Sequence, residues 1–187
     1  MRKRDDDKER RIKEAVISLI LQEGFHGASI SKIAKIAEVS PATVYVYYEN
    51  KDDMLRDIYI EYSEEIFGHL LSGVNREMGG RQLIEALVRS YYDYIVGHRE
   101  IFSFVEQFSN CPSLAKRCTG QRGVYRIYSL IEDMREHQIV KDYNGDNLMA
   151  ILFYPVKAIA FNSHKSEAER AVLLQEMIGI IQDAVLR

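Results

Sequence analysis

The chain has 187 residues, of which 47% are hydrophobic, and its 25 Lys and Arg against 28 Asp and Glu give a formal net charge of −3. This length and apolar content allow a sizeable core and more than one domain, while no apolar run approaches the roughly 20 residues of a membrane-spanning helix. The N-terminal sequence MRKRDDDKER lacks the apolar stretch of a signal peptide, so we expect a cytoplasmic protein with no membrane association.

Apolar residues recur at intervals of three and four along almost the whole sequence, which predicts an all-α protein with about nine helices and no strand. The first helix is expected over about residues 8–22 and ends at Gly24, because glycine is a common C-terminal stop. A long helix follows Asn50, which can cap it together with Asp53, and continues towards residue 72. Later helices are expected at about 83–97, 100–108, 113–138, 146–164 and 166–186.

Residues 29–51, SISKIAKIAEVSPATVYVYYENK, predict two short helices around a tight turn. The apolar positions of the first lie three and four apart on one face, at Ile30, Ile33, Ala34 and Ala37. The second helix begins where Ser40 can accept a backbone N–H and Pro41 takes the first helical position, at which no N–H is needed. Val44 and Tyr48 are expected to face inward, whereas Tyr47 is expected to be exposed or half-exposed.

The order of side chains in this second short helix is typical of a helix whose N-terminal end enters the major groove of DNA. Small residues come first and permit close approach, and hydroxyl-bearing residues follow and can bind phosphate. The positive end of the helix dipole also favours an anion at this end. The methyl groups of Ala42 and Thr43 can contact a thymine methyl group.

From Gly24 to Lys51 the sequence resembles the N-terminal helix-turn-helix of the tetracycline-repressor (TetR) family of transcriptional regulators, and the likeness covers roughly the first third of the chain. One departure is Glu38, where the family usually has Gly. A left-handed backbone there would cost a non-glycine residue about 1 kcal/mol, so we expect a slightly reshaped turn. The residues that carry the resemblance are Gly24, Phe25, His26, Gly27, Ser29, Ile33, Ala34, Ala37, Val39, Ser40, Thr43, Val44, Tyr45, Tyr48 and Lys51.

The resemblance implies a DNA-binding transcriptional regulator, by default a repressor that leaves a palindromic operator in double-stranded DNA when a small molecule binds. It divides the chain into a DNA-binding domain at 1–50 and an effector-binding and dimerisation domain at 51–187. It implies that Tyr45, Tyr47 and Lys51 bind phosphates, and that Ser31, Pro41, Ala42 and Thr43 lie nearest to the bases. The whole expected DNA-binding set is Ser29, Ser31, Lys32, Ser40, Pro41, Ala42, Thr43, Tyr45, Tyr47 and Lys51.

The last two predicted helices carry more apolar surface than a peripheral helix pair needs, and the resemblance implies that they join two copies into a homodimer. Aromatic residues are frequent in the middle of the chain. Most of them are expected in the core, but rings with a few polar groups can also line a pocket for an apolar or aromatic effector. By resemblance, the expected lining is Tyr92, Phe104, Gln107, Phe108, Tyr125, Tyr128 and Tyr154.

Charge is unevenly divided along the chain. Residues 1–51 hold ten Lys and Arg against eight Asp and Glu, so this part has a net charge of +2, whereas residues 52–187 have a net charge of −5. The charged N-terminal arm has two interpretations: it is a solvated terminus, or it contacts DNA phosphates.

Sequence motifs of enzymes and metal sites are missing. The five histidines are scattered, no Cys/His spacing suits zinc, and neither a phosphate-binding glycine loop nor a nucleophile elbow occurs. We therefore expect no catalytic residue, metal or cofactor. Cys111 and Cys118 are expected to be thiols, with a redox role as the alternative. The alternative function is that of a ligand-binding or adaptor protein of the same fold that does not bind an operator. Glu38 and Glu49 in the helix-turn-helix segment, and the negative net charge of the chain, are consistent with this alternative.

Overall fold

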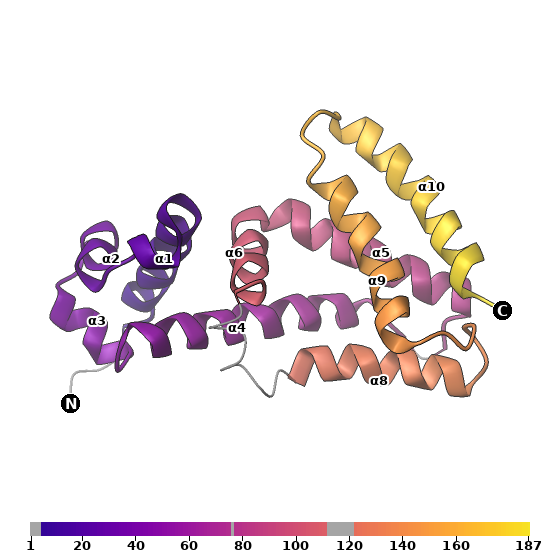
Figure 1. The fold of residues 1–187 in the computed structure, drawn as a ribbon, viewed down its shortest axis with the longest axis horizontal. Coiled ribbons are helices and arrows are strands. Elements are labelled where there is room, and N and C mark those ends of the chain that lie inside the picture. The colour runs from indigo at the N-terminus through magenta and orange to yellow at the C-terminus, as the bar shows by residue number, and fades with distance from the viewer. Residues whose placement is uncertain (1–4, 76, 112–121) are drawn as a thin grey trace. The chain divides into compact units, whose positions relative to one another are not determined.

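The computed structural model describes residues 5–75, 77–111 and 122–187. Within these residues the chain forms nine helices, with no strand beyond an isolated bridge between Val140 and Leu186, so the all-α prediction is confirmed. None of the described helices is both long and apolar enough to cross a lipid bilayer. The helices labelled in Figure 1 are α1 (Asp6–Gly27), α2 (Ile30–Ile36), α3 (Pro41–Tyr47), α4 (Lys51–Ser72), α5 (Gly80–Gly97), α6 (Arg99–Ser109), α8 (Arg122–Glu136), α9 (Gly145–Ala160) and α10 (Glu167–Val185).

The chain divides into two compact units. The first is drawn from Met1–Ser63 and Glu100–Gly120, and the second from Glu64–Arg99 and Gln121–Arg187. Helix α4 therefore contributes its first turns to one unit and its last turns to the other. The expected border between DNA-binding and effector-binding domains, at residue 50, lies inside the first unit and remains a functional prediction.

The core of the first unit forms on one face of α1. Ile12, Val16 and Ile20, four residues apart, are fully buried, as the sequence pattern predicts. Helix α6 adds Phe108, whose ring stacks on that of Tyr59 with centroids 4.1 Å apart. The ring of Phe25 meets the same Phe108 edge-on at 5.7 Å. Helix α6 thus belongs to the core of the helix-turn-helix unit, although it follows α5 in the sequence.

The end of α1 is broken at Gly24. This residue has φ +71°, a conformation that glycine adopts readily and other residues rarely do, and the helix then resumes as far as Gly27. The predicted stop at Gly24 is therefore a break in the helix, and the true end comes three residues later, before the extended Ala28.

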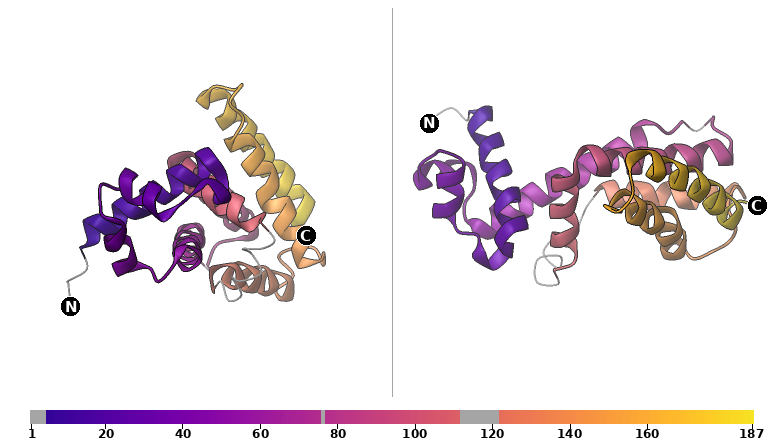
Figure 2. Two further views of the ribbon diagram at one scale, coloured as in Figure 1. Left: turned by 60° about the vertical axis from the view of Figure 1, so that its left-hand side comes forward. Right: turned by 90° about the horizontal axis from the view of Figure 1, so that it is seen from above.

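In the second unit, α9 packs against α5, α8 and α10, and α10 also packs against α5. Figures 1 and 2 show α9 and α10 running side by side. The guanidinium of Arg81 joins α5 to α10 through hydrogen bonds to Gln182 at 3.0 Å and Asp183 at 3.1 Å. Several large apolar side chains of α9 and α10 remain exposed in the single chain, among them Tyr154, Val172 and Ile180.

Helices α4 and α8 approach each other closely at Gly123. Its backbone N–H, in the first turn of α8, donates to Glu64 Oε1 at 2.8 Å. A Cβ at this position would lie 2.5 Å from Cβ of Phe67. Only glycine fits here without a shift of one helix.

Candidate nucleic-acid interface

Hydrogen bonds from serine side chains fix the starts of α2 and α3. Ser29 Oγ accepts the backbone N–H of Lys32 at 3.3 Å, and Ser40 Oγ accepts that of Thr43 at 3.1 Å. Pro41 occupies the first helical position of α3. The predicted cap at Ser40 is confirmed, and the cap at Ser29 is an additional finding. Pro41 and Ala42 are exposed, so the first turn of α3 lies at the surface.

The turn between α2 and α3 keeps the left-handed backbone that the resembled family forms with glycine. Glu38 has φ +55°, its N–H bonds to the carbonyl of Lys35, and the N–H of Val39 bonds to that of Ala34 at 2.9 Å. These two bonds make a Schellman motif. The expected reshaping of the turn is therefore not needed, and Glu38 adopts the strained conformation itself.

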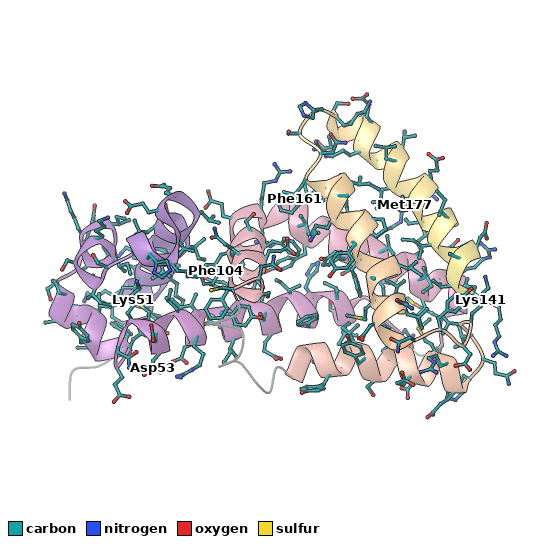
Figure 3. The ribbon with its side chains drawn as sticks, viewed as in Figure 1. Lys51, Asp53, Phe104, Lys141, Phe161 and Met177 are labelled. Atoms are coloured by element: carbon teal, nitrogen blue, oxygen red, sulfur yellow. The ribbon has the colours of Figure 1, made fainter. Side chains whose placement is uncertain are left out.

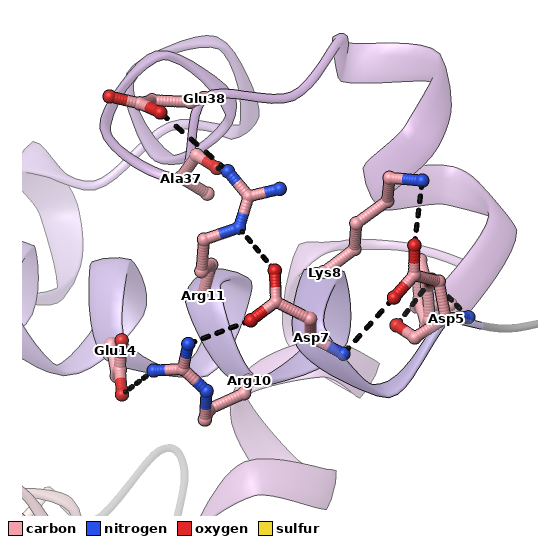
Figure 4. A network of polar contacts seen from close by, with 9 residues as sticks. Asp5, Asp7, Lys8, Arg10, Arg11, Glu14, Ala37 and Glu38 are labelled. Atoms are coloured by element: carbon pink, nitrogen blue, oxygen red, sulfur yellow. Dashed lines mark hydrogen bonds and ion pairs between the residues drawn. The ribbon is translucent and has the colours of Figure 1, made fainter.

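A guanidinium from α1 supports this turn, as Figure 4 shows. Arg11 donates to the carbonyl oxygen of Ala37 at 2.8 Å, and it lies 3.2 Å from Asp7 and 3.8 Å from Glu38. The carbonyl of Ala37 is one of the acceptors that a helix C-terminus leaves without an intrahelical partner. Arg11 thus supplies a donor and a positive charge where α2 ends.

The exposed side of the segment has the composition expected for contact with DNA. Tyr45 is 56% exposed and Val46 is 44% exposed, while Thr43 is half-buried and its hydroxyl lies 2.9 Å from that of Ser40. Val44 is fully buried and anchors α3 to the core. The other predicted contact residues that are exposed are Ser29, Ser31, Lys32, Ser40, Pro41 and Ala42.

Tyr47 is buried, contrary to the expectation of an exposed side chain. It lies three residues after Val44, so both share the inward face of α3. Its hydroxyl accepts the backbone N–H of Asp5 at 2.9 Å and donates to the backbone carbonyl of Asp5 at 3.0 Å. Nothing in the local sequence signals a contact between residues 42 positions apart.

Tyr48 faces inward as predicted, and it follows α3 in extended backbone. Its hydroxyl is buried and has no hydrogen-bond partner among the described residues. Burial, with the nearby carboxylates of Glu9, Glu61 and Asp57, raises the pKa of this phenol far above its ordinary value.

Lys51 has a structural contact in addition to its predicted phosphate contact. Its side chain is labelled in Figure 3. Nζ of Lys51 donates to the backbone carbonyls of Phe25 at 2.7 Å and Ala28 at 2.5 Å, at the end of α1. An ammonium has three donors, so one remains after these two bonds. Phosphate binding by Lys51 through that donor stays a prediction.

Among the described residues of the first unit, most cations are paired with carboxylates. Lys32 lies 2.5 Å from Glu23, and Lys13 lies 2.6 Å from Glu61. Burial by itself would lower the pKa of Lys13, but the hydrogen bonds that its ammonium donates to the carboxylates of Glu61 and Glu9, together with their negative charge, outweigh burial and raise this pKa. Lys35 is exposed, and its ammonium has no partner in the described part of the chain.

The residues predicted to line an effector pocket lie in both compact units. Phe104 and Phe108 are buried in the core of the first unit, while Gln107 is exposed. In the second unit, Tyr92 is buried, but Tyr125 and Tyr154 are 66% and 64% exposed. Tyr128 donates its hydroxyl to Asp146 at 2.7 Å, and this hydrogen bond raises the pKa of the phenol. Phe104 and Phe108 are core residues of the first unit. The effector pocket lined by the whole set remains a prediction.

The described residues contain no group of three or more His, Cys, Asp or Glu placed to hold a metal ion. Of the two cysteines, Cys111 is half-buried and Cys118 lies outside the described residues.

A hollow on the surface of the second unit contains none of the residues predicted to line an effector pocket. It is lined by Lys141, Tyr143, Asn147, Ala150, Ile151 and Ala184.

Comparison with known proteins agrees with this geometry. Residues 12–58 match the family model described as bacterial regulatory proteins, tetR family. A fatty acid metabolism regulator protein of Bacillus subtilis (strain 168) is 23% identical over 88 residues, which are 47% of this chain and 45% of the relative. An uncharacterized HTH-type transcriptional regulator, YdeS, of the same organism is 36% identical over 59 residues, 32% of this chain and 30% of the relative. These matches span less than half of each relative's length.

Solved structures resemble the chain over nearly its whole length. A TetR family transcription regulator from Marinobacter aquaeolei VT8 has a TM-score of 0.82 at 22% identity, covering 100% of this chain and 99% of the other. The transcriptional regulator FadR from Bacillus subtilis, in complex with stearoyl-CoA, has a TM-score of 0.72 at 18% identity, and the match covers 92% of this chain and 97% of FadR. At sequence identities of 22% and 18%, these structural matches establish the fold alone. Residues 12–58 are therefore similar to the tetR family of bacterial regulatory proteins, and the described helices have the fold of the solved structures to which the chain is similar.

Proposed function

We propose that this protein is a DNA-binding transcriptional regulator that acts in the cytoplasm and reads an operator with α3. The observation that carries the proposal is the exposed first turn of α3, where the small residues Pro41 and Ala42 follow the cap Ser40. Such a turn permits close approach to base edges, and the exposed hydroxyl of Tyr45 can contact a phosphate.

The test is selection of bound fragments from genomic DNA, followed by affinity measurements on the enriched sequence. Substitution of Thr43 by Val is expected to change the preferred sequence, and substitution of Lys35 by Gln is expected to weaken binding to all sequences alike. Failure to enrich any sequence would contradict the proposal.

We propose that the regulator acts as a homodimer through α9 and α10. The exposed apolar side chains of these helices, Tyr154, Val172 and Ile180, support this arrangement. A two-fold dimer presents two copies of α3 to the half-sites of a palindrome. Sedimentation is expected to give a dimer at micromolar concentration, and substitution of Val172 by Glu is expected to give a monomer.

We further propose that a small molecule releases the protein from DNA, and that long-chain acyl-CoA thioesters are the first class to test. The support is the likeness to regulators named for fatty acid metabolism, one of which holds stearoyl-CoA. A ligand that binds the folded protein raises its melting temperature, and linkage requires it to change DNA affinity if it is an effector. Stearoyl-CoA is expected to do both, while stearate and free CoA serve as controls.

One observation favours the alternative of a same-fold adaptor without operator binding. Residues 5–51 hold seven Lys and Arg against eight Asp and Glu, so this part of the helix-turn-helix unit has no positive excess. A salt-dependent affinity for duplex DNA distinguishes the two functions, because only a protein that neutralises phosphates shows it.

A further inference from the structure

The outward face of α3 lies opposite the two side chains that turn towards the core. Val44 and Tyr47 are both buried and lie three residues apart, so they share the inward face of the helix. Successive residues of an α-helix are rotated by about 100°, which places Ala42 and Val46 on the opposite side. Both are exposed, and Val46 is 44% exposed. The centre of the outward face is therefore formed by two apolar side chains four residues apart.

The polar side chains of α3 are few, and most of them are engaged within the protein. The helix sequence PATVYVY contains no Arg, Lys, Asn or Gln, which are the side chains that form paired hydrogen bonds to purine bases. The hydroxyl of Thr43 lies 2.9 Å from that of Ser40. The hydroxyl of Tyr47 bonds both the N–H and the carbonyl of Asp5. Base recognition by α3 therefore depends on contacts other than such paired hydrogen bonds.

An apolar side chain can still distinguish one base from the others in the major groove. Thymine is the base that presents a methyl group there, and apolar side chains recognise it by contact. Val46 carries two methyl groups on a β-branched side chain, which keeps mostly one rotamer in a helix and so holds them in one direction. Groups that can bind phosphate lie beside this apolar centre: the exposed hydroxyl of Tyr45, and Lys35 of α2, the helix that packs against α3. This combination suits a duplex, whose base methyl groups lie between two charged backbones.

We propose that Val46 is a specificity-determining residue, which selects thymine in the operator by contact with the C5-methyl group of that base. This inference rests on the proposed function and deepens it, because it names the base that the centre of α3 recognises. It also adds a residue to the predicted DNA-binding set, in which only Ala42 and Thr43 are expected to meet a thymine methyl group.

Removal of single methyl groups from the DNA tests the inference on the full chain. The duplex is the sequence enriched from genomic DNA, and each thymine of one half-site is replaced in turn by uracil, which lacks only the methyl group. Affinities at one salt concentration are measured for the parent, Val46→Ala and Val46→Ser, with Tyr45→Phe as the control on the same helix. Alanine has the higher helix propensity and position 46 is exposed, so Val46→Ala is expected to fold, and thermal unfolding of each variant checks this.

Loss of the contacted methyl group is expected to weaken binding of the parent about fourfold, which is the effect of burying one methyl group. In Val46→Ala and Val46→Ser, the same change in the DNA is expected to cost less than about twofold, because contacting groups are non-additive. Tyr45→Phe is expected to weaken binding to both duplexes and to keep the fourfold difference between them, since a phosphate contact carries no sequence information.

Two results would overturn the inference. The first is an operator in which the loss of no thymine methyl group weakens binding of the parent. The second is a methyl group whose loss costs the parent and both Val46 variants the same factor, because another residue, such as Ala42 or Thr43, would then recognise it. Failure to enrich any sequence would instead overturn the proposed function, so the two failures are distinguishable.

Discussion

Nζ of Lys51, the first residue of α4, donates a hydrogen bond of 2.5 Å to the carbonyl oxygen of Ala28, the C-cap of α1. The same ammonium bonds the carbonyl of Phe25 in the last turn of α1. A cation at a helix C-terminus is favourable because the unpaired carbonyls carry partial negative charge. Lys51 thus joins the end of α1 to the start of α4. The resemblance to the TetR family implies only a contact with DNA for this residue.

Lys51→Met is therefore expected to lower the free energy of unfolding by about 1–2 kcal/mol, because two carbonyls lose a charged donor while the apolar stem is kept. Chemical denaturation measures this loss. Lys35→Met, at an exposed lysine without a partner among the described residues, is the control and is expected to leave stability nearly unchanged. Equal stability of the two variants would show that the Lys51 contacts contribute little.

Two positions with the same backbone strain allow a matched prediction. Glu38 and Gln138 have φ +55° and +57°, and each ends its helix with the same pair of hydrogen bonds. Glu38→Gly and Gln138→Gly are each expected to stabilise the protein by about 1 kcal/mol, because glycine relieves a left-handed conformation. Thermal unfolding measures both.

Only Glu38→Gly is also expected to strengthen duplex binding, since it removes a negative charge from the helix-turn-helix. If Glu38→Gly destabilises the protein while Gln138→Gly stabilises it, then the 3.8 Å ion pair of Glu38 with Arg11 outweighs the strain.

The buried hydroxyl of Tyr48 gives a third prediction. Because this group has no hydrogen-bond partner among the described residues, it pays a desolvation cost on folding that a phenylalanine avoids. Tyr48→Phe is expected to stabilise the protein by about 1 kcal/mol, measured by chemical denaturation. Tyr47→Phe removes a hydroxyl with two partners, and is expected to act in the opposite direction. A loss of stability in Tyr48→Phe would point to an ordered water on the hydroxyl.

Features encoded by neighbouring residues could be predicted from the sequence. The N-cap of Ser40, the capping pair of Asn50 with Asp53 and the buried stripe of α1 all depend on residues two to four positions apart. Their hydrogen bonds and shared faces follow from helix geometry alone, whatever the rest of the fold does. The sequence alone therefore predicts the helix-turn-helix.

Features that depend on distant residues could not be predicted. The inward position of Tyr47 requires Asp5, and the Lys51 contacts require a helix end more than 20 residues earlier. The sequence pattern allows Phe108 to line a ligand pocket, because aromatic rings occur both in cores and in pockets. Its contacts with Phe25 and Tyr59, far away in the sequence, place it in the core.

The close approach of α4 and α8 gives a fourth prediction. Gly123→Ala is expected to destabilise the protein by roughly 1–3 kcal/mol, because the new methyl group would meet Cβ of Phe67, which cannot move without its backbone. Gly68→Ala is the control on α4 itself, where no heavy atom lies within 4 Å of the added Cβ. It is expected to stabilise the helix by about 1 kcal/mol through its higher helix propensity. Denaturant unfolding of both variants is the measurement, and a stabilising Gly123→Ala would contradict the contact.

The start of α10 makes stability depend on acid pH through Glu169. Its carboxylate accepts the backbone N–H of Ser166 and lies 3.0 Å from Lys165 Nζ, and these contacts lower its pKa from 4.5 to about 2. Because the folded state holds the charged form more strongly, this contribution is complete above pH 4.5 and disappears as the pH falls towards 2. Glu169→Gln keeps an acceptor but not the charge, so its stability is expected to fall less steeply over this range than that of the parent. Unfolding midpoints measured across the range test this, and parallel curves for parent and variant would show that other carboxylates control the acid response.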